Sequence, residues 1–383
     1  MTKKTNVVIV SEFFPRSAIG EARGGVEMRC WHIAQRLTDD YDVTVITSRE
    51  PKLPDTDQFG EIHVLRRGPV REYSQVGSPM KRLKFMIDVY KSIVTLQPKV
   101  IDAQSYVAYL PAFYAAKKVG AFAIATYHDV WKGRWTKLFG LVGLIGEVYE
   151  RICLSKKWDL FIANSHFTKK GLVSAGIHNS NIEVVHNGID LEMIQSIEAE
   201  KYLQPTICSI TRLVSYKRVI DLINAVAIVK DQLPTIQCKI IGTGPDLSLL
   251  KKEIQKRALT DTIELLGFVS SSKEVMRILQ RSQVFCLPSE IEGFGIVVAE
   301  AMASKVPVVA TNIPPIVEVT QQGKGAVLVK PRSVEELAKA LVTLLTDLKL
   351  QKQYIEHGAK IAQEYNWDTI GVRVADLYKN ILL

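Results

Sequence analysis

The feature that most constrains the fold of this 383-residue chain is a regular alternation of short β-branched runs with longer amphipathic stretches. The runs are short enough for buried strands, and the stretches between them have a helical pattern. Strands and helices that alternate in this way predict parallel, doubly wound α/β sheets. We expect a first series of strands at residues 7–10, 43–47, 100–103, 122–126, 160–163 and 182–185, and a second at 206–210, 237–241, 262–265, 284–287, 306–310 and 326–329.

The alternation occurs twice, which predicts two domains, because a chain of this length is too long for one ordinary core. A polar, acidic segment over residues 190–205 separates the two series and is the expected linker. Ligands of such sheets bind beyond the carboxyl ends of the strands, and clefts between domains are favoured sites, so we expect the two domains to face a cleft. The predicted parts are a first α/β domain over 1–190, a second over 203–365, and a C-terminal segment over 366–383 that returns to the first domain.

Composition narrows the class of protein. Hydrophobic residues make up 47% of the chain and charged residues 23%, as in ordinary soluble proteins. The apolar run after the first residues is too short for a signal peptide, and no run reaches the length of a transmembrane span. The five cysteines are scattered in apolar runs, which favours reduced core residues in a cytoplasmic protein. The net charge of +9 comes with no nucleic-acid-binding motif, so we expect no nucleic-acid partner.

Glu292 and Glu300 enclose a glycine-containing turn that follows a predicted strand and opens a helix over residues 296–303. Gly293 and Gly295 allow a backbone path that leaves amide groups at the helix start free to bind an anion, phosphate above all. Carboxylates repel phosphate and accept hydrogen bonds from sugar hydroxyls, so the pattern suits a nucleotide sugar. The alternative is an ordinary surface loop between two solvated glutamates.

Two further motifs follow strands of the second half. Arg212 and Lys217 lie five residues apart in one strand-to-helix turn, where they can converge on a diphosphate, although a pair of surface charges is the alternative. Gly242 and Gly244 form a glycine turn at the next strand end. Since Leu247 occupies the place of a third glycine, this turn lacks the complete dinucleotide fingerprint, and we expect it to be a tight turn beside the site.

The first half carries two candidates. Gly24 and Gly25 precede a helix and permit close approach of a phosphate or sugar, although a plain flexible loop fits the same pattern. His128 lies just past the predicted strand 122–126, where a histidine with a structural role is the alternative to one that contacts a ligand.

Together these motifs, with the Asn187-Gly188-Ile189-Asp190 segment, resemble the retaining glycosyltransferases of family 4, which have the GT-B fold of two Rossmann-like domains. The resemblance covers essentially the whole chain, with the motifs in the family's order. It implies a nucleoside-diphosphate sugar as donor and cosubstrate, no further cofactor and no required metal ion. The chain departs from the family where Thr211, Arg218 and Lys305 stand in place of common glycines, and where Thr311-Asn312 replaces a glycine pair.

By position, the resemblance implies roles for individual residues. Arg212 and Lys217 would neutralise the diphosphate leaving group, Glu292 would hold sugar hydroxyls, and His128 would lie near the reacting sugar carbon. These four are the predicted catalytic residues. The predicted donor-binding residues are Gly24, Gly25, Gly242, Gly244, Val269 against the base, Gly293, Phe294, Gly295, Ile296, and Glu300 on the ribose hydroxyls.

The expected activity is transfer of a hexose to an acceptor hydroxyl, on a lipid-linked or cell-envelope glycan. A soluble synthase with a small sugar or sugar-phosphate acceptor and a noncatalytic nucleotide-sugar binding protein are the alternatives. Residues 80–86 and 131–141 mix basic, aromatic and apolar side chains, which suits contact with an anionic membrane surface and equally suits core helices with a solvated basic face. We therefore expect a cytoplasmic protein that can be peripheral on the inner face of the cell membrane.

Overall fold

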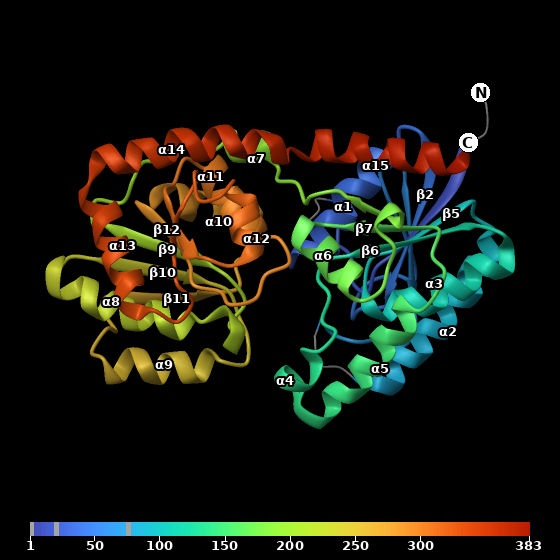
Figure 1. Ribbon diagram of the computed structural model, residues 1–383, viewed down its shortest axis with the longest axis horizontal. Coiled ribbons are helices and arrows are strands. Elements are labelled where there is room, and N and C mark those ends of the chain that lie inside the picture. The colour runs from blue at the N-terminus through green and yellow to red at the C-terminus, as the bar shows by residue number, and fades with distance from the viewer. Residues whose placement is uncertain (1–3, 19–22, 74–77) are drawn as a thin grey trace. The chain divides into compact units, whose positions relative to one another are not determined.

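The computed structural model of the chain describes residues 4–18, 23–73 and 78–383, without the side chains of Leu138 and Phe139, and it divides into two compact units (Figure 1). Unit 1 comprises Met1–Asn187 and Trp367–Leu383, and unit 2 comprises Gly188–Asn366. Each unit has its own parallel sheet covered by helices, so the predicted fold class of two doubly wound α/β sheets is confirmed.

Unit 1 contains an eight-stranded sheet in the order β3-β4-β2-β1-β5-β6-β7-β8. All neighbouring strands are parallel except β3 and β4, which form an antiparallel pair at one edge. These two strands were not predicted, because their side chains are largely polar and partly exposed. The strands are β1 (Thr5–Val10), β2 (Tyr41–Ser48), β3 (Thr56–Phe59), β4 (Ile62–Arg67), β5 (Val100–Ala103), β6 (Phe122–Tyr127), β7 (Leu160–Ala163) and β8 (Ile182–Val184).

Helices cover both faces of this sheet, because successive strand side chains point to opposite faces and both sets are apolar. Val8 and Val10 pack with α2, α3 and α5 on one face, while Val7 and Ile9 pack with α1 and α15 on the other. The C-terminal helix α15 therefore belongs to the core of unit 1. The helices are α1 (Gly25–Leu37), α2 (Pro79–Leu96), α3 (Tyr106–Val119), α4 (Trp135–Phe139), α5 (Gly143–Leu154), α6 (His166–Ser174) and α15 (Trp367–Leu382), with short 3₁₀ turns η1 (Gly140–Val142) and η2 (Asn179–Asn181).

Unit 2 contains a six-stranded, fully parallel sheet in the order β11-β10-β9-β12-β13-β14. The unit has two hydrophobic cores, one on each face of the sheet. Ile207 and Cys208 are neighbours in β9, and their side chains belong to different cores. The strands are β9 (Thr206–Ile210), β10 (Gln237–Ile241), β11 (Ile263–Gly267), β12 (Val284–Leu287), β13 (Val308–Thr311) and β14 (Val327–Val329). The helices are α7 (Leu191–Gln195), α8 (Val219–Gln232), α9 (Leu247–Lys256), α10 (Ser272–Arg281), α11 (Ile296–Ala303), α12 (Pro314–Val319), α13 (Val334–Thr346) and α14 (Leu348–Ala362), with 3₁₀ turns η3 (Ser215–Lys217) and η4 (Gln363–Tyr365).

All five cysteines are buried, and none belongs to a disulfide, as the sequence predicted. Within the described ranges, no helix combines the length and the apolar character that crossing a bilayer requires.

Candidate active site

The candidate donor site lies where the strand order of unit 2 reverses. Strands β9 and β12 are neighbours, and the chain continues from β9 toward β10 on one side and from β12 toward β13 on the other. Ligands of open α/β sheets bind outside the carboxyl ends of strands at such a switch point. Two predicted motifs follow these two strands: Arg212 and Lys217 follow β9, and Glu292 through Gly295 follow β12. Sheet order thus brings together side chains that are about 80 residues apart in the chain.

Lys217 and Glu292 form an ion pair across this switch point. The Lys217 Nζ atom lies 2.5 Å from Glu292 Oε1 and donates a longer hydrogen bond, 3.4 Å, to the carbonyl of Ile291. The two side chains are only 10% and 11% exposed. The pair is therefore largely withdrawn from water but still open on one side to a ligand. A ligand phosphate would compete with Glu292 for the ammonium group, whereas a sugar hydroxyl could donate to the carboxylate.

The loop that carries Arg212 rests on the glycine turn after β10. Leu213 N–H donates to the carbonyl of Thr243 at 2.9 Å, and Asp246 N–H donates to the carbonyl of Leu213 at 3.0 Å. A Cβ atom on Gly242 would lie 1.8 Å from the carbonyl oxygen of Thr211.

Gly244 is constrained in the same way, because a Cβ atom there would lie 2.1 Å from the carbonyl oxygen of Leu213. Both glycines are therefore required for the approach of the Arg212 loop. Arg212 itself donates from Nη2 to the hydroxyl of Tyr216 at 3.0 Å, which directs its half-buried guanidinium group.

The turn before α11 exposes backbone amides. Gly295 adopts φ 95° and ψ 48°, and a Cβ atom on it would lie 2.6 Å from Ile316 Cδ1, so only glycine fits. No side chain caps this helix, and the amides of Ile296 and Val297 have no acceptor within the described part of the chain. Free amides at the positive end of a helix bind anions.

The Phe294 side chain does not face this anion site. It is 2% exposed and packs edge-on against Tyr365 with 5.3 Å between ring centroids. A contact of Phe294 with a donor would therefore come from its backbone.

Glu300 lies on the second turn of α11 and is half-buried. Burial, together with the nearby carboxylate of Asp190, raises the pKa of Glu300 to about 7. Its carboxyl group accepts no hydrogen bond from any described residue. A carboxyl group in this state has unused capacity for hydroxyl donors.

Val269 follows β11 and packs, half-buried, against the core of unit 2, while the neighbouring Phe268 is 55% exposed. The carbonyl of Gly267 accepts a 2.8 Å hydrogen bond from Gly242 N–H. The loops after β9, β10 and β11 are therefore joined at one edge of the sheet.

In unit 1, His128 follows β6, and its Nε2 atom is buried without a partner. Burial and, to a smaller extent, the charge of Arg29 lower the pKa of His128 to about 3, although a hydrogen bond with the backbone of Gln104 opposes the shift. The imidazole is therefore neutral at physiological pH. It can hydrogen-bond a ligand but carries no charge toward it.

A buried polar network lies close to His128, and its centre, Asp102, was missed in the sequence. Asp102 accepts hydrogen bonds from Thr126 Oγ1 at 2.7 Å, Gln104 Nε2 at 2.9 Å and the Tyr378 hydroxyl at 2.7 Å. Burial raises the pKa of Asp102 despite these bonds. The available signal was a carboxylate inside the apolar run of β5, since acids are rarely buried without partners.

Arg29 is the second buried charge of this region, at 1% exposure. Its Nη1 atom donates to the carbonyls of Val185 and His186 at 3.0 and 2.8 Å and to Asn187 Oδ1 at 3.0 Å. Burial lowers the pKa of Arg29 to about 10. Arg29 thus anchors residues 185–187, where the first of the two chain segments of unit 1 ends.

Gly24 and Gly25 open α1, and residues 19–22, one residue before them in the chain, lie outside the described residues. A Cβ atom on Gly24 would lie 3.0 Å from the Tyr73 hydroxyl. The preceding residue, Arg23, forms ion pairs with Glu27 at 2.7 Å and Glu50 at 2.5 Å. Within each unit, the predicted site residues lie in the loops and helices that follow the carboxyl ends of the strands.

Sequence families match each unit in turn. The family described as Glycosyltransferase Family 4 matches residues 23–193, and Glycosyl transferases group 1 matches residues 192–361. A GDP-mannose-dependent alpha-(1-6)-phosphatidylinositol monomannoside mannosyltransferase of Mycobacterium tuberculosis is 27% identical over 241 residues, which is 58% of this chain. That match spans 62% of the relative's length.

Solved structures resemble the whole chain. Sucrose-phosphate synthase from Thermosynechococcus elongatus has a TM-score of 0.82 at 17% identity and covers 99% of both chains. Anabaena Alr3699/HepE, solved in complex with UDP-glucose, has a TM-score of 0.76 at 19% identity and covers 98% of this chain and 99% of its own.

Two doubly wound units of this kind, in this order, define a glycosyltransferase with the GT-B fold. Since one family matches each unit, the chain belongs to glycosyltransferase family 4, as its motifs predicted.

Proposed function

We propose that this protein is a retaining hexosyltransferase that uses a nucleoside-diphosphate sugar and needs no metal ion. The observation that carries the proposal is the Lys217–Glu292 ion pair beside Arg212 and the free amides of α11. Cations and amides suit a diphosphate, and carboxylates suit the hydroxyls on either side of it. The relative from Mycobacterium tuberculosis is named for GDP-mannose, and the Anabaena structure contains UDP-glucose, which supports this class of donor.

In the proposed reaction, the bond between the anomeric carbon and the donor phosphate oxygen breaks, and a bond to the acceptor oxygen forms on the same face of the sugar. The acceptor proton passes to a donor phosphate oxygen. Arg212, Lys217 and the amides of Ile296 and Val297 stabilise the charge that grows on the diphosphate. His128, being neutral, hydrogen-bonds near the reacting carbon without opposing the positive charge that develops there.

The acceptor is proposed to be a hydroxyl of a lipid-linked or cell-envelope glycan, bound by unit 1, with an anionic membrane surface as a partner and the cytoplasm as the location. The phosphatidylinositol acceptor in the name of the mycobacterial relative supports this choice. A small sugar-phosphate acceptor is the second candidate, because the structural neighbour with a TM-score of 0.82 is named as a sucrose-phosphate synthase.

Thermal unfolding with a panel of nucleoside diphosphates and nucleotide sugars tests the donor, because a ligand that binds the folded state raises the melting temperature. We expect one base to stabilise the protein with EDTA present as well as with Mg²⁺. The Arg212→Ala variant should lose most of this shift. Arg257→Ala, at the C-cap of α9, should keep it, because the Arg257 guanidinium pairs with Glu253 away from the site. A panel without any stabilising nucleotide would contradict the proposal.

A further inference from the structure

The hairpin formed by α4 and α5 in unit 1, drawn as a ribbon in Figure 1, carries an unusually apolar surface. Its exposed side chains are aliphatic and recur at helical spacing, so they occupy one face of η1 and α5. This apolar face consists of Leu141, Val142, Leu144, Ile145, Val148 and Ile152, which are 86, 73, 51, 72, 57 and 40% exposed. A contiguous exposed apolar surface of this kind marks an interaction site.

The hairpin holds this face in a fixed orientation. Glu150, which is fully buried, accepts hydrogen bonds from Trp135 Nε1 at 2.7 Å, Trp131 N–H at 3.0 Å and the Tyr106 hydroxyl at 2.9 Å. A Cβ atom on Gly146 would lie 2.5 Å from the Trp135 ring. The close contact between α4 and α5 therefore depends on that glycine, and Trp135 is turned toward α5 rather than outward as a membrane anchor.

The acidic and basic side chains of this segment differ in their exposure. Residues 131–157 contain two acids, Glu147 and Glu150, and both are buried. The exposed charges of the same segment are all positive: Lys132, Lys137, Arg151 and Lys157 are exposed, and Arg134 and Lys156 are half-buried. An apolar face whose own segment exposes only cations is complementary to a surface that is apolar inside and anionic outside.

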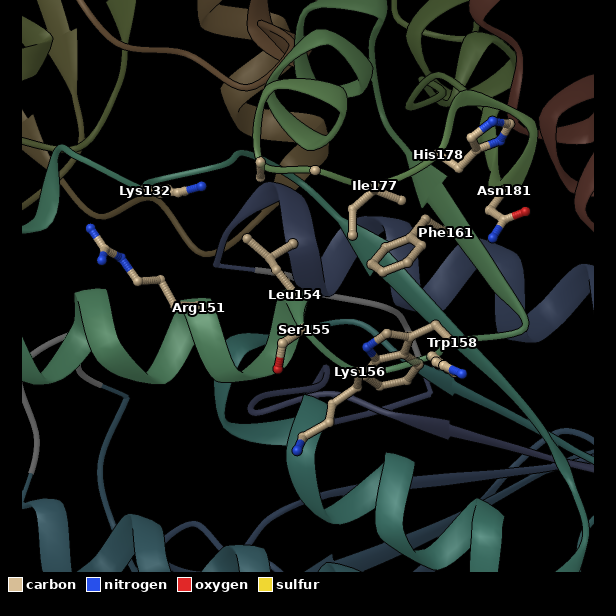
Figure 2. A pocket seen from close by; sticks show the side chains of 13 residues that line it. Lys132, Arg151, Leu154, Ser155, Lys156, Trp158, Phe161, Ile177, His178 and Asn181 are labelled. Carbon is tan, nitrogen blue, oxygen red and sulfur yellow. The ribbon is translucent and has the colours of Figure 1, made fainter.

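A groove of about 880 Å³ lies beside the C-terminal end of α5 (Figure 2). Leu154, Phe161 and Ile177 form its apolar centre, with Lys132 and Arg151 on one side and Lys156 on another. Arg151 lines the groove and its neighbour Ile152 belongs to the apolar face, so the two features meet on one helix.

We propose that the apolar face of η1 and α5 inserts into an anionic phospholipid bilayer while the cations of the adjacent groove bind lipid phosphates. The inference deepens the proposed function, on which it rests for the lipid-linked acceptor, by naming the surface that meets the membrane. A second copy of the chain fits less well, because a two-fold contact would bring the same cations face to face.

Sedimentation with vesicles tests this docking. The wild type should bind vesicles of phosphatidylcholine with 30% phosphatidylglycerol, bind pure phosphatidylcholine at least tenfold less well, and release at about 0.5 M salt, following the screening of surface charge. The double variant Ile145→Glu/Val148→Glu, at two exposed positions, should lose at least tenfold in affinity. Lys132→Glu/Lys157→Glu should lose about tenfold or more, since each basic residue near the surface contributes to attraction.

The matched control reverses the same two charges at exposed positions of α9 in unit 2, as Lys251→Glu/Lys252→Glu, and should bind vesicles nearly as well as the wild type. An equal loss in this control would overturn the proposal, because it would show that only net charge matters. Absence of wild-type binding would overturn it too, as would a dimer that Ile145→Glu/Val148→Glu dissociates, measured by light scattering without vesicles.

Circular dichroism checks that each variant folds, and the shift of melting temperature by UDP and GDP is measured separately. Loss of vesicle binding with an intact nucleotide shift would place the effect in docking alone. A missing nucleotide shift with intact vesicle binding would instead count against the proposed donor and leave the docking surface standing.

Discussion

The two units have the same strand order around their switch points, β2-β1-β5-β6 in unit 1 and β10-β9-β12-β13 in unit 2. They differ in whether the charged side chains at the strand ends are accessible to a ligand. Unit 2 leaves an ion pair, a half-buried arginine and free amides within reach of a ligand. Unit 1 buries its charges in a network around Asp102 and Arg29 and offers a neutral histidine. The same strand order can thus suit a charged or an uncharged ligand. The difference depends on whether the charged side chains at the strand ends are paired with other protein groups or are left accessible.

The same contrast appears in proton binding. Burial raises the pKa of Glu300 to about 7 in unit 2 and lowers the pKa of His128 to about 3 in unit 1. In both cases the neutral form is favoured, but the acid is neutral below its pKa and the base above it. The two residues should therefore make their units respond to pH with opposite signs.

The largest expected effect tests whether charge in unit 2 drives the chemistry. Arg212→Ala should lower turnover by roughly 100- to 1000-fold, as removal of one preorganised donor to a developing charge does. The measurement is release of nucleoside diphosphate at saturating donor, with Arg257→Ala as the control that keeps its activity. Unchanged turnover with bound donor would remove Arg212 from the mechanism and weaken the contrast between the units.

His128 provides the next test, on unit 1. Its folded-state pKa lies below the unfolded value of 6.5, so the stability it contributes is present above pH 6.5 and is lost as pH falls toward 3. Between pH 7.5 and 4.5 the wild type should lose about 3 kcal/mol more unfolding free energy than His128→Gln.

Tryptophan fluorescence measures this loss in unit 1 alone, because all five tryptophans, Trp31, Trp131, Trp135, Trp158 and Trp367, belong to it. The exposed His178→Gln is the control and should follow the wild type at both pH values. Equal pH slopes for wild type and His128→Gln would show that the imidazole is not held neutral by burial.

Glu300→Gln tests the opposite sign in unit 2. The folded-state pKa of about 7 lies above the unfolded value of 4.5, so wild-type stability falls as pH rises from 4.5 through 7. At pH 8 the variant should be more stable than the wild type by about 1 to 2 kcal/mol, and at pH 4.5 the difference should vanish.

Urea unfolding followed by circular dichroism measures the Glu300→Gln effect, with the exposed Glu335→Gln on α13 as the control. The same variant should bind nucleoside diphosphate more weakly, since a charged acceptor of ribose hydroxyls is lost. If Glu300→Gln were less stable than the wild type at pH 8, the ionised Glu300 carboxylate would not destabilise the fold, and the raised pKa would be contradicted.

The smallest effect concerns backbone conformation near the unit 2 site. Lys305, just after α11, has a left-handed backbone with φ 54°. The next residue, Val306, donates its N–H to the carbonyl of Ala301, and a helix C-terminus of this kind favours glycine at the left-handed position. Lys305→Gly should raise the unfolding free energy of unit 2 by about 1 kcal/mol, or its melting temperature by about 2 to 4 °C. Lys339→Gly, inside α13, should change stability by a similar amount in the opposite direction. Destabilisation by both substitutions would show that the left-handed conformation at Lys305 carries no strain.

Much of this architecture could be predicted from the chain alone. All six strands of the second series lie within two residues of their expected limits, and the helix expected at 296–303 is α11. The antiparallel pair β3 and β4 was missed because β3 is almost wholly polar and β4 contains a histidine and two arginines among only three apolar residues. The predicted roles of Glu292 and Glu300 in holding a donor remain predictions, which the variants above test.

The sequence by itself determined the two sheets, the order of the motifs and the family, because periodicity of apolar residues and glycine turns are local signals. Only the tertiary structure decided that Lys217 pairs with Glu292, 75 residues away, and that Tyr378 bonds Asp102, 276 residues away. It also decided that Gly242 and Gly244 support the Arg212 loop and that Trp135 faces α5. The physical reason is that sheet order and burial fix which strand ends meet and which polar groups lose water, and neither quantity is encoded in a local pattern.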